Sequence, residues 1–313
     1  MPLGLRRGTV TAVRERLDEL VRLEVDGIAC IAYPRLTGPV EEGDDVIVNE
    51  QARLLNLGSG GFDILYANLT RGLDLPPVEG AHVMKLPYTP GQLALPHVEE
   101  TAMLAEALDG LPVVLCTLHS QVVPVCAGLA GTRVAYVQVA GGALPVSLSD
   151  VVRALKARGL IGVAVAVAPC LDGDVECVGV AAALAWAKEQ GYEAVVCSVG
   201  PGIVGTGSRL GHGALALADA ATAAGALGGR PLLAVRTSGV DARERHQGVS
   251  HHARAVLDLT PADVRLAGEA DGDGWEEACT GLPLDHMGRG PGDDPDFFRA
   301  AYAAGVAARK LLR

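Results

Sequence analysis

Residues 160–168 read LIGVAVAVA, and residues 194–199 read AVVCSV. Each is a short, almost continuous apolar run rich in β-branched residues, which is typical of a strand buried on both faces of a sheet. Three further runs share this character, at residues 112–118, 133–140 and 231–236. Helix-like patterns fill the intervals at residues 149–157, 178–190 and 213–227. This alternation predicts an α/β fold with a doubly wound, mostly parallel sheet.

The first 90 residues have a different pattern. Short alternating or β-branched segments, separated by turn residues, lie at residues 8–13, 21–33, 45–48 and 62–66. Such segments predict a small N-terminal antiparallel β-barrel or sandwich. Prolines and a glycine then interrupt regular structure, so we expect a β-rich domain at residues 1–90, a linker at 91–97 and an α/β domain at 98–313. Within the last, helices are expected at residues 98–108 and 297–312.

The composition excludes several classes of protein. Hydrophobic residues make up 49% of the 313 residues and charged residues 20%, which is typical of a globular chain and not of a disordered one. No apolar run approaches the roughly 20 residues that span a bilayer, and the N-terminus carries no signal-peptide core. We therefore expect a cytoplasmic protein without a membrane partner. The formal charge of -11 disfavours nucleic acid. The seven cysteines form no C-x-x-C pair and predict no disulfide framework.

Functional side chains or bare backbone follow each predicted strand. The carboxyl ends of parallel strands meet at one edge of the sheet, where ligands of open α/β folds bind. His119, Ser120 and Gln121 follow the first strand, and Gly141 and Gly142 follow the second. A histidine beside a serine can transfer a proton, so His119 and Ser120 are candidate catalytic residues. Gln121 and the two glycines are candidate ligand-binding residues. The alternative is a hydrogen-bonded structural histidine in an ordinary turn.

The fourth strand is followed by GPGIVGTGSRLGHG, residues 200–213. Glycines permit close backbone approach to a ligand, and a following helix directs its amide groups at an anion. We therefore expect an anion-binding loop, with candidate residues Gly200, Gly202, Gly205, Thr206, Gly207 and Ser208. The loop lacks the Gly-Lys-Ser/Thr of a P-loop, and no acidic residue ends the next strand as a dinucleotide fingerprint requires. The alternative is a turn that needs glycine for packing.

Basic residues gather after the fifth strand, in residues 236–254, although the protein as a whole is acidic. Arginine presents a planar fork of donors to phosphate or carboxylate, and a serine at a helix start adds further donors. The candidate ligand-binding residues here are Arg236, Ser238, Arg243, Arg245, Ser250 and His251, and His246 is a candidate for proton transfer. The alternative is a solvated loop with surface ion pairs.

No metal ligand is assigned from the sequence. His246, His251 and His252, together with Asp241, are residue types that bind zinc. Adjacent histidines on a helix face different ways, however, so we expect His251 and His252 not to share an ion. The chain also contains no H-E-x-x-H or H-x-H motif. No pattern identifies a cofactor.

Five motifs make the chain resemble a family of bacterial proteins of unknown function. They are LTGPVEEGDDVIVN (36–49), LHSQ (118–121), AYVQVAGGALPVSLSDVVRAL (135–155), GPGIVGTGSRLG (200–211) and RHQGVSHH (245–252). The resemblance extends over almost the whole chain. It implies that the β-rich and α/β parts belong together, and it implies no activity and no catalytic residue.

These patterns together favour an enzyme or a binding protein for a small anionic metabolite, phosphorylated or carboxylated. They leave open whether the protein catalyses a reaction. One alternative is a noncatalytic scaffold whose β-rich part docks a protein partner, and another is a metal-dependent hydrolase. A homodimer is the default expectation, because it is the commonest oligomer.

Overall fold

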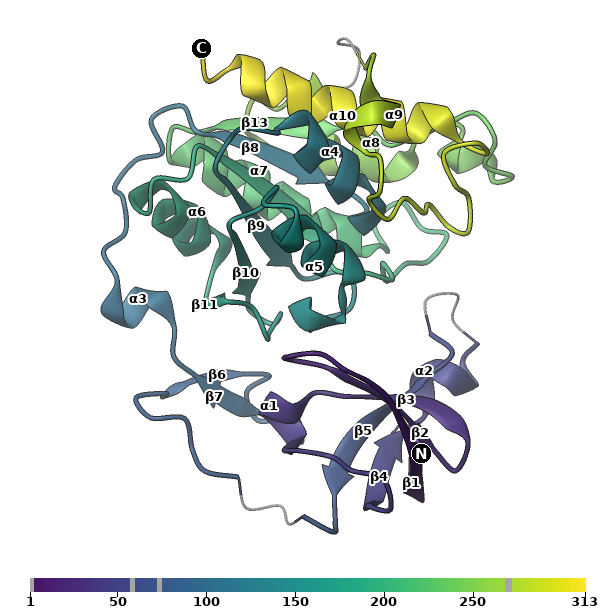
Figure 1. Ribbon diagram of the computed structural model, residues 1–313. Helices are drawn as coiled ribbons and strands as arrows, with labels where there is room; N and C mark the ends of the chain where they lie inside the picture. The colour runs from purple at the N-terminus through teal and green to yellow at the C-terminus, as the bar shows by residue number, and fades with distance from the viewer. Residues whose placement is uncertain (1–2, 57–59, 72–74, 268–271) are drawn as a thin grey trace. The chain divides into compact units, whose positions relative to one another are not determined.

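The chain divides into two compact units, Met1–Leu95 and Pro96–Arg313 (Figure 1). A computed structural model describes residues 3–56, 60–71, 75–267 and 272–313. Across these described residues, no helix combines the length and the apolar character needed to cross a membrane. Each unit has its own hydrophobic core.

The first unit contains a closed barrel of five strands. They are β1 (Leu5–Arg16), β2 (Val21–Val25), β3 (Ile28–Ala32), β4 (Asp45–Asn49) and β5 (Asp63–Asn68), in the order β1-β2-β3-β5-β4. Alternate side chains such as Val10, Leu23 and Val48 point inward and form its core. Register shifts along β1 let this long strand bend around the barrel. The predicted barrel is therefore confirmed, although its β3–β5 pair is parallel.

Short elements complete the first unit. They are α1 (Pro34–Thr37), α2 (Gln51–Leu54), β6 (Val83–Lys85) and β7 (Leu93–Leu95). The strands β6 and β7 form an antiparallel pair. Thus β7 lies within residues 91–97, where the sequence predicts a linker. Pro90 and Gly91 belong to the connection between two paired strands.

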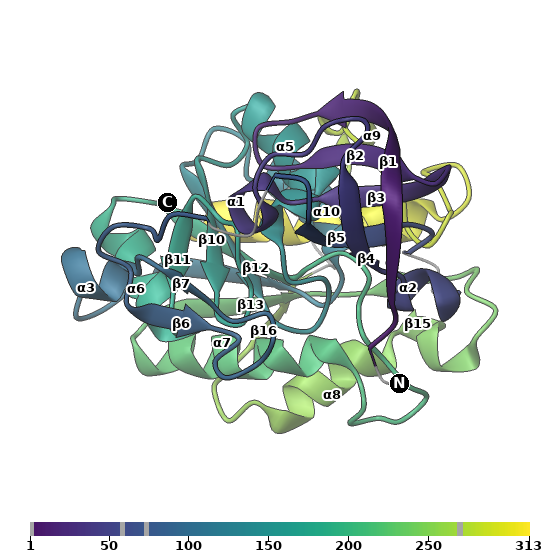
Figure 2. The same ribbon diagram turned by 90° about the horizontal axis from the view of Figure 1, so that it is seen from below.

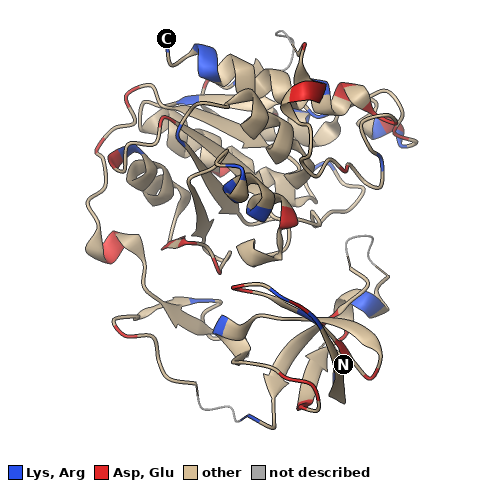
Figure 3. Cartoon of the chain, in the orientation of Figure 1, with Lys and Arg blue, Asp and Glu red and all other residues tan. Residues whose placement is uncertain are grey.

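The second unit is built on a seven-stranded, all-parallel sheet. Its strands are β8 (Pro112–Cys116), β9 (Val134–Val139), β10 (Val163–Val167), β11 (Val175–Cys177), β12 (Ala194–Val199), β13 (Arg230–Ala234) and β16 (Arg265–Ala267). Their order is β11-β10-β9-β12-β8-β13-β16. The strands β8, β9, β10 and β12 carry no charged residue, as Figure 3 shows, because helices cover both faces of the sheet.

Two layers of helices cover the sheet (Figures 1 and 2). One layer contains α4 (Val122–Gly128), α5 (Asp150–Ala157), α9 (Trp275–Ala278) and α10 (Pro295–Lys310). The other contains α6 (Val180–Glu189), α7 (Ala216–Ala226) and α8 (His251–Leu259). Along each strand the side chains alternate between the layers: Val114 and Cys116 pack in the first, and Val113 and Leu115 in the second. The predicted doubly wound α/β fold is confirmed.

The helix predicted at residues 98–108 is much shorter than expected. It is α3 (Val98–Thr101), and an irregular segment follows it. Backbone amides in that segment bond to other elements: Ala105 N donates to the Ala185 carbonyl at 3.3 Å, and Leu108 N donates to the Leu227 carbonyl at 2.7 Å. These tertiary bonds replace the i to i−4 bonds that would continue a helix.

Candidate functional site

The carboxyl ends of β12, β8 and β13 are neighbours at one edge of the sheet. The chain leaves β8 for α4 on one face and leaves β12 for α7 on the other face. Strand connections that diverge in this way open the crevice where α/β folds bind ligands. Gln121 joins two of the loops, because its side-chain amide donates to the Ala234 carbonyl at 3.0 Å. It also accepts from Leu118 N and the Thr117 hydroxyl, both at 3.1 Å. The amide of Gln121 is thus committed to protein partners.

His119 lies in a second hydrogen-bond network at this edge. Its Nδ1 lies 3.3 Å from the Val199 carbonyl, which can only accept, so this nitrogen carries the proton. Its Nε2 then accepts from the Ser149 hydroxyl at 2.6 Å. Ser149 Oγ in turn accepts from Val152 N at 3.0 Å and caps α5. Burial lowers the pKa of His119 to about 4. The two hydrogen bonds engage both ring nitrogens with protein partners. A catalytic role for His119 stays a prediction.

The depressed pKa of His119 predicts acid sensitivity. The unfolded chain takes up a proton near pH 6.5 and the folded chain only near pH 4, so unfolding is favoured as the pH falls through this window. One such histidine contributes a slope of at most about 1.4 kcal/mol per pH unit. We expect H119Q to reduce the pH dependence of the free energy of unfolding, measured in urea between pH 4 and pH 7. A slope identical to that of the wild type would contradict the assignment.

Four glycines allow the loops after β9 and β12 to cross. A Cβ on Gly213 would lie 1.9 Å from the Gly141 carbonyl oxygen, and one on Gly142 would lie 2.2 Å from that of Gly200. A Cβ on Gly200 would lie 2.1 Å from the Ala143 carbonyl oxygen. These contacts are with rigid backbone. Packing alone therefore accounts for glycine at positions 141, 142 and 200, where the sequence also allows ligand binding.

The predicted anion-binding loop forms an exposed hairpin. Its strands meet at an isolated bridge between Gly205 and His212. Thr206 N donates to the Gly211 carbonyl at 2.7 Å, and Ser208 N donates to the Thr206 hydroxyl at 3.1 Å. Gly202 has a positive φ of 65°, and Gly207 has open space around it. Several amides of the loop are thus used within it, and anion binding by its tip stays a prediction.

A buried ion network lies after β13. Asp241, 2% exposed, accepts from Arg243 through Nε and an amino group, each at 2.9 Å. Arg289 approaches the same carboxylate at 3.5 Å and Arg236 at 3.7 Å. The hydrogen bond from Arg243 holds the pKa of Asp241 well below its usual range. We call Arg236, Asp241, Arg243, Arg289 and Asp294 the arginine network.

Ser238 and Asp294 fix one side of the arginine network. Asp294 accepts from the Ser238 hydroxyl at 2.7 Å and lies 3.4 Å from Arg289 Nε. Ser238 Oγ also accepts from Asp241 N at 3.1 Å. The network combines three guanidinium groups with two carboxylates, so it carries one excess positive charge. Arg245 lies outside it and is exposed.

Four imidazole rings pack together beside Arg236. His212 immediately precedes the 3-10 turn η3 (Gly213–Leu215), and His251 and His252 form the first turn of α8. The ring centroids of His212 and His252 are 4.1 Å apart, and those of His251 and His252 are 4.4 Å apart. His246, in the turn η4 (Glu244–His246), lies 4.8 Å from His251. We call these four residues the histidine cluster.

Hydrogen bonds connect the histidine cluster to the arginine network. Arg236 donates to Nδ1 of His252 at 3.2 Å and approaches Ser250 Oγ at 3.5 Å. Ser250 Oγ also accepts from His252 N at 3.3 Å, so its own proton goes to Nδ1 of His246 at 2.9 Å. Burial lowers the pKa of His246 to about 3 and that of His252 to about 2. The cluster is therefore neutral near pH 7, and neutral imidazole is the form that binds metal ions.

Ser120 reaches the same region through His286. Its hydroxyl lies 3.3 Å from Nδ1 of His286, and the His286 ring stacks on Phe297 at 3.7 Å between centroids. His286 is also bonded through its backbone to Arg289. Burial lowers the pKa of His286 to about 3. Ser120 thus has a histidine partner, but His286 is a weak base in this environment.

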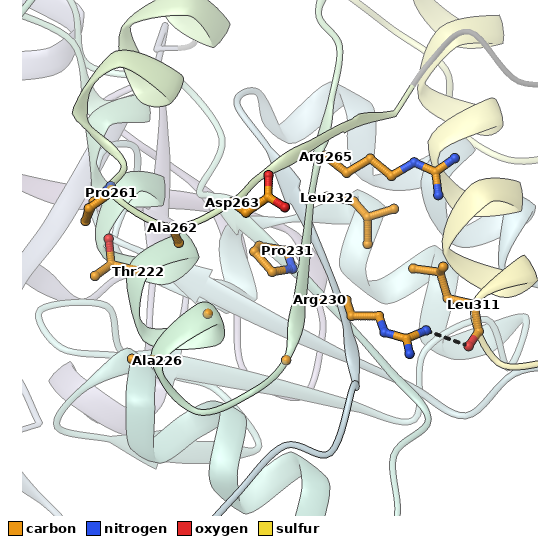
Figure 4. Close-up of a pocket in the computed structure, with 12 residues that line it drawn as sticks. Thr222, Ala226, Arg230, Pro231, Leu232, Pro261, Ala262, Asp263, Arg265 and Leu311 are labelled. Carbon is orange, nitrogen blue, oxygen red and sulfur yellow. Dashed lines mark hydrogen bonds between the residues drawn. The ribbon is translucent and has the colours of Figure 1, made fainter.

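A cavity of about 620 Å³ lies at the opposite end of the sheet. Figure 4 shows its lining at the amino ends of β13 and β16, with Arg230 donating to the Leu311 carbonyl. Arg230, Asp263 and Arg265 are all solvent-exposed there. The buried polar groups and the displaced pKa values gather instead at the carboxyl ends, so we place the candidate site there.

The structure brings together most of the basic segment predicted from the sequence and adds residues from distant parts of the chain. His212, His286, Arg289 and Asp294 join it from two other loops, and none of them was a candidate. His212 is the last residue but one of the glycine-rich run at residues 200–213, so the sequence offers a signal for it. His286 and Arg289 lie in an acidic stretch and carry no such signal.

Comparison with known proteins places the chain in a family. A search of curated proteins finds no match. A family model described as a protein of unknown function, DUF3866, matches residues 29–273. This range begins at the second residue of β3 and includes β4, β5 and the whole parallel sheet. The chain therefore belongs to the DUF3866 family, whose function is not known.

Proposed function

We propose that this protein binds a small molecule with a phosphate or carboxylate group at the arginine network. The proposal rests on the burial of Arg236, which is 1% exposed and has few good hydrogen-bond acceptors within reach. Its nearest carboxylate oxygen, on Asp241, is 3.7 Å away, and its Nε has no hydrogen-bond partner. A buried guanidinium offers five donors, and leaving them unpaired is costly. An anion supplies the missing acceptors.

Met287 occupies the place where such an anion would bind. Its sulfur lies 3.9 Å from one amino group of Arg236 and 3.1 Å from one of Arg243. A thioether is a weak acceptor, so it satisfies two guanidinium groups poorly. The side chain is 59% exposed, which allows it to move aside. Ligand entry by displacement of Met287 then requires no opening of the core.

The same geometry favours binding over acid–base catalysis. His246 and Ser120, two candidates for proton transfer predicted from the sequence, reach this region through Ser250 and His286. The pKa of His246 is about 3, far from the neutral value at which a general base works best. A noncatalytic scaffold would also fold around this region, but scaffolding gives no reason to bury a guanidinium with unused donors. Binding of an anion gives one.

A binding measurement with an arginine variant tests the proposal. Orthophosphate, pyrophosphate, citrate and succinate are titrated into wild type and R236K, with affinity read by calorimetry and by thermal shift. Lysine keeps the charge but loses the planar fork, so we expect at least one anion to bind R236K about 10-fold more weakly or worse. Phosphate stabilises folded proteins generally at high concentration, so the difference between the two proteins is the informative quantity.

R14K is the matched control. Arg14 makes an exposed ion pair with Glu24 in the barrel, so its replacement leaves the proposed site unchanged. M287A is expected to bind the anion at least as tightly as wild type, because it removes the competing sulfur. Equal responses of wild type and R236K to every anion tested would count against an anion site at Arg236.

A further inference from the structure

Three rings of the histidine cluster form a set of convergent nitrogen donors. His212, His251 and His252 each offer one ring nitrogen, and these atoms all lie within 4.8 Å of one another. They come from two segments: the end of the loop after β12 and the first turn of α8. Three nitrogens on one tetrahedral ion lie about 3.3 Å apart, at metal–nitrogen lengths of about 2.0–2.1 Å. Small ring rotations bring the three donors to that spacing.

Two of the three histidines offer ring nitrogens that lack protein partners. His212 is only 5% exposed, and neither of its ring nitrogens has a hydrogen-bond partner. Nε2 of His251 is likewise buried and unpartnered. Buried polar atoms in native proteins are almost always satisfied, because an unsatisfied one costs about 1–3 kcal/mol. A metal ion that accepts one lone pair from His212 and one from His251 accounts for these unpartnered nitrogens.

We propose that His212, His251 and His252 bind one divalent transition-metal ion, preferably Zn²⁺. The set contains only imidazoles, which suit Zn²⁺, Co²⁺ and Ni²⁺, whereas Mg²⁺ and Ca²⁺ prefer oxygen ligands. Three protein ligands leave one tetrahedral position for water or for an oxygen of a bound anion. The second part of this inference rests on the anion site proposed above, and the metal site itself does not.

Arg236 couples the metal site to the anion site. Arg236 now donates to Nδ1 of His252 at 3.2 Å, which uses the lone pair of that nitrogen. An ion bound at Nδ1 needs the same lone pair. An ion bound at Nε2 requires the ring proton on Nδ1, which then cannot accept from arginine. In either case the ion breaks this hydrogen bond and frees the guanidinium for an anion. Metal and anion are therefore expected to strengthen each other's binding.

Titration of protein prepared without a histidine tag tests the metal site. Chelator-treated wild type is titrated with Co²⁺, followed by its visible absorption, and then with Zn²⁺ in competition. We expect one ion per chain, a tetrahedral Co²⁺ spectrum and displacement of Co²⁺ by Zn²⁺. Removing a direct ligand in H212N or H251N is expected to weaken Co²⁺ binding by about 100-fold or more, since loss of a second-shell partner alone costs about 10–100-fold.

H82Q is the control for these variants, because His82 is an exposed histidine of the first unit. Circular dichroism establishes whether each variant is folded, and the wild-type titration does not depend on any variant. Failure of wild type to bind one Co²⁺ or Zn²⁺ per chain overturns the metal site. Unchanged Co²⁺ affinity in both folded H212N and H251N also overturns it.

R236M separates the two proposals. We expect it to bind Zn²⁺ at least as tightly as wild type, because the competing hydrogen bond is gone, and to lose the response to phosphate. Metal binding without any anion response in wild type refutes the anion site alone. An anion response that needs Arg236, in a protein that binds no metal, refutes the metal site alone. Equal phosphate affinity of wild type with and without Zn²⁺ refutes the coupling.

Discussion

Replacing Gly213 with alanine is expected to destabilise the second unit by about 3 kcal/mol or more. The added Cβ would lie 1.9 Å from the carbonyl oxygen of Gly141 and 2.4 Å from its Cα. Both atoms belong to the backbone of the loop after β9, so no side-chain rotation relieves the overlap. The crossing also positions His212, the preceding residue. Urea unfolding followed by tryptophan fluorescence measures the loss, because Trp186 and Trp275 both lie in this unit.

G207A provides the matched control in the same glycine-rich run. A Cβ on Gly207 would meet nothing within 4 Å, and its φ is not positive. We therefore expect a change below about 0.5 kcal/mol, as for an ordinary surface substitution. Unfolding of G213A at the same urea concentration as G207A would show that the backbones of the two loops do not cross in close contact.

D241N is expected to cost about 3 kcal/mol or more, since it removes one partner from a buried ion network. Arg243, Arg289 and Arg236 all approach this carboxylate, the first at 2.9 Å. A neutral amide leaves three guanidinium groups with only Asp294 to balance them. Thermal unfolding and urea titration at pH 7 measure the loss, and D241N/R243M is expected to recover part of it because one uncompensated cation is gone.

The anion proposal adds a second expectation for D241N. An anion at the network replaces part of the lost negative charge, so orthophosphate is expected to raise the melting temperature of D241N more than that of wild type. D258N is the control: Asp258 forms an exposed pair with Arg209 at 3.1 Å, which contributes at most about 1 kcal/mol. A D241N protein as stable as D258N would show that the network is not held by this carboxylate.

The architecture of the second unit follows from local patterns. The strand patterns in residues 112–118, 133–140 and 160–168 each contain an observed strand, because a strand buried on both faces must be apolar throughout. The strands β11 and β16 were not predicted, since each has only three residues at a sheet edge. The helix α4 was missed because VVPVCAG is buried and has no polar face to give a helical period.

The candidate site was predictable only in part. Arg236, Arg243, His246, Ser250 and His251 were identified because arginines and histidines cluster in one segment of an acidic chain. Their partners were not predictable, since Arg289 and Asp294 approach them from a loop about 50 residues away. The expectation that adjacent histidines diverge follows from regular helical geometry. Here His251 and His252 stand at the start of α8, and their ring centroids are 4.4 Å apart.

Local patterns in the amino-acid sequence predict the β-rich and α/β parts, the doubly wound sheet and the edge at which polar residues gather. Hydrophobic periodicity and turn residues act over a few positions, so both can be recognised in a single amino-acid sequence. These patterns do not reveal that His212 lies against His252 or that Arg236 is buried with an unpartnered Nε, which the folded chain shows. Such contacts depend on how loops fold back over the strand ends, and short-range patterns do not encode which distant side chains then meet.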